Sequence, residues 1–232
     1  MPVRLAAWFQ ASRPLAAAQM LAPLGFGMSL AWADRGAFRG KIAWLLVAFT
    51  LLDQLVIVFA NDVADLRTDL ENRTHNRFSG GSRVIAEGKL SPLDLGRGAL
   101  VSLLALGAVS AYLALVELRA FMVVLAAIAA HLLWMYSFPP FRLSYRGHGE
   151  ILQALGLGAV LPLAGYYGQT GDVDGLTLPA LAGPLLLGWA GNVLTALPDR
   201  PSDEASGKRS LAVRRGEPAA RRAALLALAL AV

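Results

Sequence analysis

The sequence predicts an all-α fold, a polytopic transmembrane helical bundle, from three observations. The chain has 232 residues, 56% of them hydrophobic, with a mean hydropathy of +0.53. Only 16% of its residues are charged, against about 25% in soluble domains. Its apolar residues form long runs without strict alternation, which favours helices over a β-barrel. Helices satisfy every backbone polar group within the span, as a lipid bilayer requires.

Six apolar runs follow one another, each close to the ~20 residues that a helix needs to cross a bilayer. These predicted spans are residues 14–33, 42–61, 98–116, 120–138, 151–170 and 176–197. A seventh run starts near Ala223 and reaches the end of the chain at Val232, which is too short to cross. We therefore expect a single transmembrane domain over residues 1–232, truncated at its C-terminus, with six full spans and part of a seventh.

The N-terminal segment is predicted to be the first span. Arg4 and Arg13 precede its apolar run, but the run is too long for a signal peptide and lacks a clear cleavage site. The chain contains no cysteine, which excludes disulfides and thiolate metal sites.

The basic residues are distributed unevenly between the two sides of the membrane. If the N-terminus is cytoplasmic and the six spans alternate, all but four of the 21 lysines and arginines fall on the cytoplasmic side. The exceptions are Arg35, Arg39, Lys41 and Arg119. This positive-inside pattern predicts a multi-pass protein of the cell (inner) membrane. Because the basic residues lie in short loops between spans, we expect no nucleic-acid partner.

The first of two acidic clusters ends the second span, in N-D-V-A-D-L-R-T-D, residues 61–69. If the helix continues through it, Asp62, Asp65 and Asp69 lie within about 60° of one another. Three carboxylates on one stripe repel each other unless a cation lies among them. Mg2+ prefers such oxygen ligands and often bridges carboxylates to substrate phosphates. The alternative is a solvated acidic helix end with arginines as ion-pair partners.

The second cluster follows the sixth span, in D-R-P-S-D-E-A-S-G-K-R, residues 199–209. Asp199 and Asp203 stand four residues apart with Pro201 between them. Proline is not tolerated inside a helix but is accepted in its first turn, so we expect a turn and the start of a new helix. An ordinary capped loop is the alternative.

The two clusters form a weak internal repeat. Asn61 and Asn192 occupy matching places, each before aspartates and basic residues. Two halves of this kind would face each other across a central cavity on the cytoplasmic side. Metal-binding aspartates beside fixed cations predict that the site handles a diphosphate.

Two further features leave alternatives open. Tyr145, Arg146 and Glu150 lie beside two glycines at a span entry. They are interpreted either as a cover over the site, with Glu150 as a base, or as an interfacial tyrosine and a snorkelling arginine. Asp53 lies within the second span, where a carboxyl group is costly, and is either functional or paired inside the bundle.

Four stretches together resemble the UbiA superfamily of intramembrane aromatic prenyltransferases. In order, they are N-D-V-A-D-L-R-T-D (61–69), R-T-H-N-R-F-S-G-G-S-R-V-I-A-E-G-K-L-S-P (73–92), Y-S-F-P-P-F-R-L-S-Y-R-G-H-G-E (136–150) and N-V-L-T-A-L-P-D-R-P-S-D-E-A-S-G-K-R-S-L-A-V-R-R-G (192–216). The D-x3-D-x3-G-K-R spacing in the last stretch is the most specific element.

The resemblance implies a nine-helix bundle around a central cavity. It also implies Mg2+-dependent transfer of an isoprenyl chain from an allylic polyprenyl diphosphate to an aromatic acceptor. By motif match, the metal and the diphosphate would be held by Asp62, Asp65, Asp69, Asp199 and Asp203. The same match places further substrate-binding groups at Asn61, Arg73, Arg77, Tyr145, Arg146, Asn192, Lys208 and Arg209.

The motifs favour one acceptor but leave others open. S-G-G-S-R and G-K-R-S-L-A-V-R-R-G are similar to 1,4-dihydroxy-2-naphthoate polyprenyltransferases of menaquinone biosynthesis. The run from Asp69 to Arg77 is more similar to the branches that act on 4-hydroxybenzoate and heme, although Phe78 stands where those branches usually have proline. We expect 1,4-dihydroxy-2-naphthoate, with 4-hydroxybenzoate, homogentisate, heme or chlorophyll-type acceptors as alternatives. A non-enzymatic membrane carrier is an alternative from a different functional class. Such a carrier should have several acidic residues deep within its spans, whereas here only Asp53 lies deep.

Overall fold

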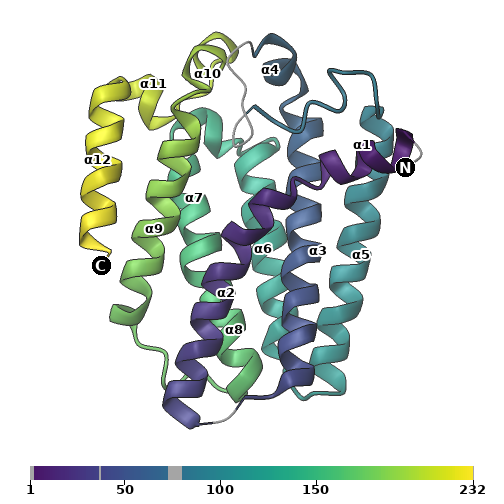
Figure 1. The fold of residues 1–232 in the computed structure, drawn as a ribbon, viewed down its shortest axis with the longest axis vertical. Coiled ribbons are helices and arrows are strands. Elements are labelled where there is room, and N and C mark those ends of the chain that lie inside the picture. The colour runs from purple at the N-terminus through teal and green to yellow at the C-terminus, as the bar shows by residue number, and fades with distance from the viewer. Residues whose placement is uncertain (1–2, 37, 73–79, 232) are drawn as a thin grey trace.

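The computed structural model describes residues 3–36, 38–72 and 80–231. Within these ranges the secondary structure is entirely helical, without a strand. The long helices stand side by side in one bundle, with α2 (Pro14–Arg35) beginning partway along it (Figure 1). The prediction of an all-α membrane bundle is confirmed.

In the described ranges, five helical segments are long and apolar enough to cross a membrane, namely Arg4–Arg35, Gly40–Ala64, Pro92–Leu115, Gly149–Thr170 and Leu178–Ala196. The first contains the short α1 (Val3–Ala11) and the long α2 (Pro14–Arg35). The others contain α3 (Gly40–Ala64), α5 (Pro92–Leu115), the continuous run of α7 (Gly149–Leu155), η2 (Gly156–Val160) and α8 (Leu161–Thr170), and α9 (Leu178–Ala196). The remaining predicted span is the shorter apolar helix α6 (Phe121–Ser137), and the seventh apolar run lies in α12 (Glu217–Leu230).

Local sequence explains where two of these helices begin or bend. Ser91 and Asp94 form a capping box, with Pro92 in the first helical position, so α5 starts well before its apolar run. Between α7 and α8 the chain makes one π-helical turn, η2, at a glycine-containing segment that faces the interior.

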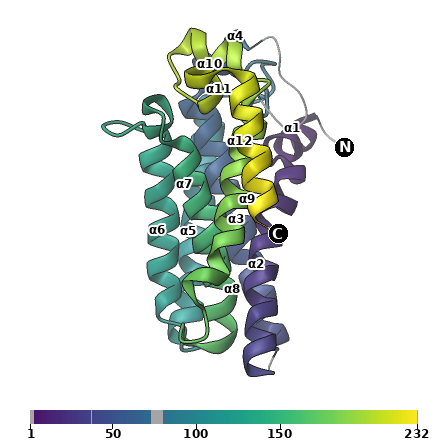
Figure 2. The ribbon, with the colours of Figure 1, turned by 90° about the vertical axis from the view of Figure 1, so that its left-hand side faces the viewer.

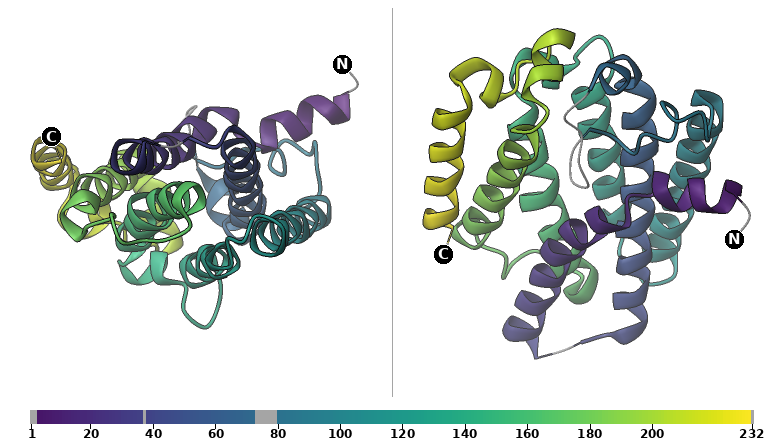
Figure 3. Two further views of the ribbon diagram at one scale, coloured as in Figure 1. Left: turned by 90° about the horizontal axis from the view of Figure 1, so that it is seen from below. Right: turned by 45° about the horizontal axis from the view of Figure 1, so that its top comes forward.

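Small residues allow two of the helices to approach closely. A Cβ atom at Gly27 of α2 would lie 2.8 Å from the carbonyl carbon of Pro162 in α8, so only glycine fits there. Gly165 of α8 likewise faces the α2 backbone. Close backbone approach of this kind is a common way for helices to associate in lipid. Seen along the helix axes, α12 lies at one edge of the bundle beside α9, and α5 lies toward the other (Figure 3).

The short helices gather at one end of the bundle. They are α4 (Leu66–Glu71), α10 (Arg200–Ser206) and α11 (Leu211–Arg215). Figures 1 and 2 show them above the ends of α3 and α9, and both acidic clusters are in this region. The two clusters, far apart in the sequence, therefore lie at the same end of the molecule.

Candidate active site

A cavity of about 1140 Å3 runs from the end with the short helices into the bundle. Its wall is formed by side chains of α2, α3, α6, α7, η2 and α9. Members of both acidic clusters line its mouth, including Asp65, Asp69, Asp199 and Asp203. The deeper wall is mostly apolar, with Met20, Ala129 and Val160.

The first cluster is divided by a break in the helix. α3 ends at Ala64 and α4 begins at Leu66, because Asp65 adopts φ −97° and ψ 12° outside the regular helix. The expectation of three aspartates on one continuous helical stripe is therefore wrong. Asp62 belongs to α3, whereas Asp69 belongs to the separate helix α4.

Asp62 is not among the residues that line the cavity, although its partners Arg13 and Ser82 are. Its carboxylate is buried, only 3% exposed, and forms an ion pair with Arg13 from the junction of α1 and α2. It also accepts hydrogen bonds from the hydroxyl and the backbone N–H of Ser82. These contacts join the N-terminal helices, α3 and the chain that follows α4. They satisfy Asp62 without any cation from solvent.

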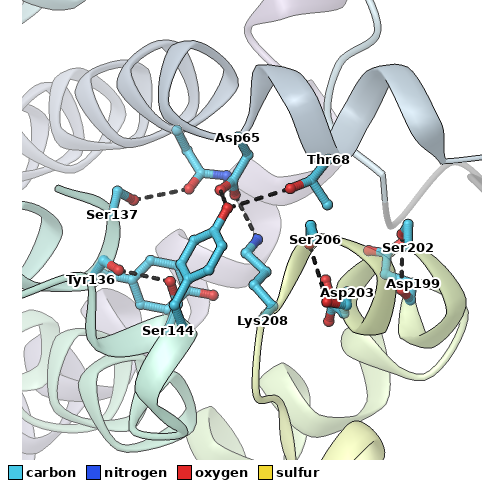
Figure 4. A network of polar contacts seen from close by, with 12 residues as sticks. Asp65, Thr68, Tyr136, Ser137, Ser144, Asp199, Ser202, Asp203, Ser206 and Lys208 are labelled. Carbon is cyan, nitrogen blue, oxygen red and sulfur yellow. Dashed lines mark hydrogen bonds and ion pairs between the residues drawn. The ribbon is translucent and has the colours of Figure 1, made fainter.

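Asp65 links the first cluster to the second. Its carboxylate lies 2.7 Å from the ammonium group of Lys208 and accepts a hydrogen bond of 3.2 Å from the Tyr145 hydroxyl. The Tyr145 hydroxyl also lies 3.3 Å from the hydroxyl of Thr68. Figure 4 shows Lys208 extended toward Asp65, with Asp199 and Asp203 on the neighbouring turn.

Asp69 lies in an electrostatically unfavourable position. Burial raises the pKa of its carboxyl group to about 7, and the neighbouring Asp62 and Asp65 contribute to the increase. The guanidinium group of Arg83 donates to the backbone carbonyl of Asp69 and so does not neutralise the carboxylate directly. A divalent cation in the cavity would relieve this repulsion.

The second cluster is presented by a turn and a new helix, as predicted. Asp199 precedes α10, and Pro201 lies in the first turn of that helix. The Asp199 carboxylate accepts hydrogen bonds from the Asn72 amide at 2.8 Å and from the Gly80 N–H at 3.0 Å. It thereby connects the second cluster to the chain just after the first.

Asp203 and Lys208 complete the mouth of the cavity. Burial raises the pKa of the Asp203 carboxyl group to about 6, although Lys208 acts in the opposite direction. Burial alone would lower the pKa of the Lys208 ammonium group, but Asp65, Tyr136 and Asp203 together raise it. Lys208 is therefore a permanently charged group between the two clusters. An ammonium group in such a place is a point charge suited to a phosphate oxygen.

The donor set fits a hard divalent cation that is shared with a substrate. Among the described residues, no group of three acidic or histidine side chains is close enough to hold a metal alone. Mg2+ is commonly held by one or two carboxylates and completed by waters and substrate phosphates. The raised pKa values of Asp69 and Asp203 identify two carboxyl groups that a cation would stabilise in their ionised form.

The other predicted site residues divide into three groups. Asn61 and Asn192 line the cavity, where Asn61 accepts a hydrogen bond from Ser137 at 3.1 Å. The exposed side chains of Arg146 and Arg209 are not among the residues that line it. Arg73 and Arg77 lie outside the residues that the structure describes.

Glu150 has a partner that the sequence did not reveal. Its carboxylate accepts a hydrogen bond of 2.5 Å from the backbone N–H of Leu211, at the start of α11, and lies 3.8 Å from Arg214. Glu150 therefore attaches the segment after Lys208 to α7. This contact favours a positioning role over the role of a base.

Sequence reasoning missed several residues of the site. From the sequence, Arg13 counts only as a basic residue that sets the membrane orientation, yet its guanidinium group forms an ion pair with Asp62. Its position immediately before Pro14, at the start of a span, was the available signal. Ser82, Tyr136 and Gln153 also line the cavity, and Gln153 accepts a hydrogen bond of 2.5 Å from Asn192. Ser82 and Tyr136 lie within two of the stretches that carry the family resemblance, but nothing in those stretches singles them out, and Gln153 lies outside all four.

Comparison with known proteins gives consistent matches. The model of the UbiA prenyltransferase family matches residues 20–232. A 1,4-dihydroxy-2-naphthoate octaprenyltransferase of Haemophilus influenzae is 30% identical over 224 residues, covering 92% of this chain and 70% of the relative. One of the same description from Mycobacterium tuberculosis is 27% identical over 214 residues, covering 91% of this chain and 70% of the relative.

The fold also matches a solved structure. A UbiA homolog from Archaeoglobus fulgidus, determined bound to DMAPP and Mg2+, aligns with a TM-score of 0.71 at 18% sequence identity. The alignment covers 97% of this chain and 74% of that one. At this level of identity the match concerns the arrangement of the helices.

Proposed function

The chain belongs to the UbiA prenyltransferase family. On that premise we propose that it transfers an isoprenyl group from an allylic polyprenyl diphosphate to an aromatic acceptor, 1,4-dihydroxy-2-naphthoate. One observation carries the proposal. Acids from two distant segments meet around Lys208 at the mouth of a single cavity within an apolar bundle.

The protein is an integral membrane protein, with several helices long and apolar enough to span a bilayer. We propose that residues 1–232 act as one transmembrane prenyltransferase domain of the cell membrane, with the N-terminus and the cavity mouth on the cytoplasmic side. The distribution of lysine and arginine supports this orientation. The soluble diphosphate head group and the acceptor would then reach the site from the cytoplasm while the isoprenyl tail remains in or near lipid.

The residues at the cavity mouth would bind the diphosphate. Asp65, Asp69, Asp199 and Asp203 are the proposed holders of Mg2+, which when bound would neutralise the diphosphate and stabilise its developing negative charge as a leaving group. Lys208 would contact diphosphate oxygens directly from between the two clusters. Asp62 would act from behind the site, because it holds Arg13 and Ser82.

The deeper cavity would exclude water from the reaction. When the bond between the isoprenyl carbon and the diphosphate oxygen breaks, the resulting allylic cation must meet the aromatic ring before it meets water. The apolar wall, which includes Leu132, Leu133 and Leu157, favours that outcome because it offers water few hydrogen-bonding partners. The acceptor then forms the new bond to the isoprenyl carbon and loses a proton.

The acceptor is proposed from the two relatives of the same description, which support 1,4-dihydroxy-2-naphthoate. The experiment supplies membranes containing the full chain with geranylgeranyl diphosphate, Mg2+ and a panel of aromatic acids, and measures prenylated product by mass spectrometry. We expect a prenylated naphthalene product that requires Mg2+ and disappears in Asp65→Asn and in Asp199→Asn.

Asp174→Asn is the matched control, because Asp174 is exposed in the turn between α8 and α9, at the opposite end of the bundle. It should retain wild-type product formation. Product from a different acceptor would preserve the reaction class and change the substrate. Absence of both product and diphosphate release with every acceptor would contradict the proposed function.

A further inference from the structure

Two polar side chains lie deep in the cavity, well below both acidic clusters. Asp53 and Gln54 belong to α3, are each only 4% exposed, and both line the cavity. The residues around them at this depth include the apolar Met20, Ala129 and Val160, with the polar Gln19 beside Met20 on α2. The carboxyl group of Asp53 and the amide group of Gln54 therefore contribute polar atoms to a mostly apolar floor.

The depth of this floor follows from helix geometry. Asp53 precedes Asn61 by eight residues of α3, which places it about 12 Å further into the bundle. The same offset separates Ala129 from Ser137 on α6, and Ser137 donates a hydrogen bond to Asn61. Asp53 and Ala129 are therefore at one level, below the residues that line the mouth.

The polar groups of the floor have no protein partner to explain them. The Gln54 amide nitrogen is buried without a hydrogen-bond partner. Among the described residues, no hydrogen bond or ion pair reaches the Asp53 carboxyl group. Leaving buried polar groups unpaired is costly, and more so in the apolar part of a membrane protein. Buried polar groups without a protein partner are typical of a ligand-binding site.

The polar groups of the floor are better suited to the aromatic acceptor than to the isoprenyl diphosphate. Within the described part of the chain, the floor contains no lysine or arginine that could bind a diphosphate. An isoprenyl tail has no polar atom to offer to Asp53 or Gln54. An aromatic acceptor carries hydroxyl groups, which donate to and accept from a carboxyl and an amide group. We propose that Asp53, with Gln54 beside it, forms a second polar subsite that binds a ring hydroxyl group of the aromatic acceptor, an inference that rests on the proposed function.

The distances are compatible with this assignment. Asp53 lies about 18 Å below Asp65 along α3. The space between Asp53 and Asp65 has to hold the metal, the two reacting groups and the hydrogen bond to Asp53. These take metal–oxygen contacts of about 2 Å, a gap of about 3–3.5 Å between reacting atoms, and a hydrogen bond of about 2.8 Å. The diphosphate ester and one aromatic ring fill the remainder. Asp53 would thus be a binding residue that fixes the ring beneath the isoprenyl carbon.

The test compares acceptor and donor kinetics in the full chain, using 1,4-dihydroxy-2-naphthoate and geranylgeranyl diphosphate. We expect Asp53→Leu to raise the KM for the acceptor about tenfold or more, while the KM for the diphosphate changes less than about twofold. Asp53→Asn keeps a hydrogen-bonding group and should recover most of the loss. Thr50→Val is the matched control, because it removes a buried hydroxyl from the same helix outside the cavity wall.

A binding measurement separates this proposal from the proposed function. Calorimetric titration of the purified protein with 1,4-dihydroxy-2-naphthoate and with its 4-methoxy derivative needs no turnover. We expect Asp53→Leu to weaken binding of the dihydroxy compound about tenfold and to leave the methoxy derivative unchanged. If no acceptor were turned over but the dihydroxy compound still bound as expected, only the proposed reaction would be contradicted, and the subsite would stand.

The subsite would be overturned if Asp53→Leu bound the dihydroxy compound and used it with wild-type KM. If the leucine variant does not fold, Asp53→Ala replaces it, because alanine also removes the hydrogen-bonding group. The subsite would equally be overturned if the wild-type protein bound neither compound.

Discussion

The two ends of the bundle both carry charged side chains, but they arrange them differently. At the end away from the short helices, several charged groups pair with opposite charges or bind the carbonyls of a helix end. Arg35 lies 2.8 Å from Asp34 and 2.9 Å from Asp172, and Arg119 donates to the carbonyl of Gly168 at 2.9 Å. At the other end, several acids surround a cavity and share one buried ammonium group, that of Lys208.

This difference separates charges that close a fold from charges that hold a ligand. Matched pairs leave nothing for a substrate to neutralise. At the cavity mouth, the pKa values of Asp69 and Asp203 rise to about 7 and about 6, chiefly because their ionised forms are buried. Functional sites concentrate such perturbed groups. Four substitutions test whether the two ends differ in this way.

Replacing the shared cation should have the largest effect. We expect Lys208→Met to lower kcat/KM for the diphosphate about 100-fold, because a preorganised positive charge is lost where negative charge develops. Lys41→Met removes a lysine that pairs with Glu117 at 2.5 Å at the opposite end, and should change kcat/KM less than about twofold. Steady-state kinetics in membranes measure both. Equal losses in the two variants would remove the distinction between the ends.

Asp62→Asn should cost less activity than Asp65→Asn. We expect about a tenfold loss, against about 100-fold or more for Asp65→Asn, because Asp62 is directed at Arg13 and Ser82 while Asp65 faces the cavity. The effects of Asp62→Asn and Arg13→Met should also be less than additive, since the two residues form one ion pair. Additive losses, or a greater loss for Asp62→Asn, would show that Asp62 acts on the substrate.

Gly27→Ala should destabilise the bundle without changing the site. A Cβ atom there meets the backbone of Pro162, which cannot move aside as a side chain could, so we expect a loss of about 1–3 kcal/mol. Gly25→Ala is the control, because nothing lies within 4 Å of its Cβ position. It should be neutral or stabilising by about 0.5–1 kcal/mol. Thermal unfolding in detergent tests both, and equal melting temperatures would contradict close packing of α2 on α8.

Arg119→Met should affect stability alone. Arg119 is buried and donates to backbone carbonyls at the end of α8, so its loss leaves acceptors unpaired at an expected cost of about 1–3 kcal/mol. The folded fraction should keep the wild-type KM for the diphosphate. A changed KM with unchanged melting temperature would mean that this end of the bundle also contributes to the site.

The sequence was sufficient to predict the spans and the two acidic clusters. Runs of apolar residues have few alternatives in lipid, so helix positions follow from length and composition alone. Pro201 likewise predicts that a turn and a new helix present Asp199 and Asp203, as the structure shows. In these cases local sequence decides the local structure.

The directions of individual side chains could not be predicted in the same way. The helix breaks at Asp65, and Asp62 turns to Arg13, a residue 49 positions away in the chain. Arg146 and Arg209 stand within recognised motifs yet are exposed. Tertiary contacts decide these outcomes, and a motif identifies residue types without fixing what each side chain meets.

Binding of the diphosphate is the most direct test that the two clusters act together. Calorimetric titration of geranylgeranyl diphosphate into purified wild-type protein, Asp65→Asn and Asp199→Asn, each with and without Mg2+, isolates this step from the chemistry. We expect binding that depends on Mg2+ in the wild-type protein and is lost when either cluster is altered. Full Mg2+-dependent affinity in either variant would contradict a shared site.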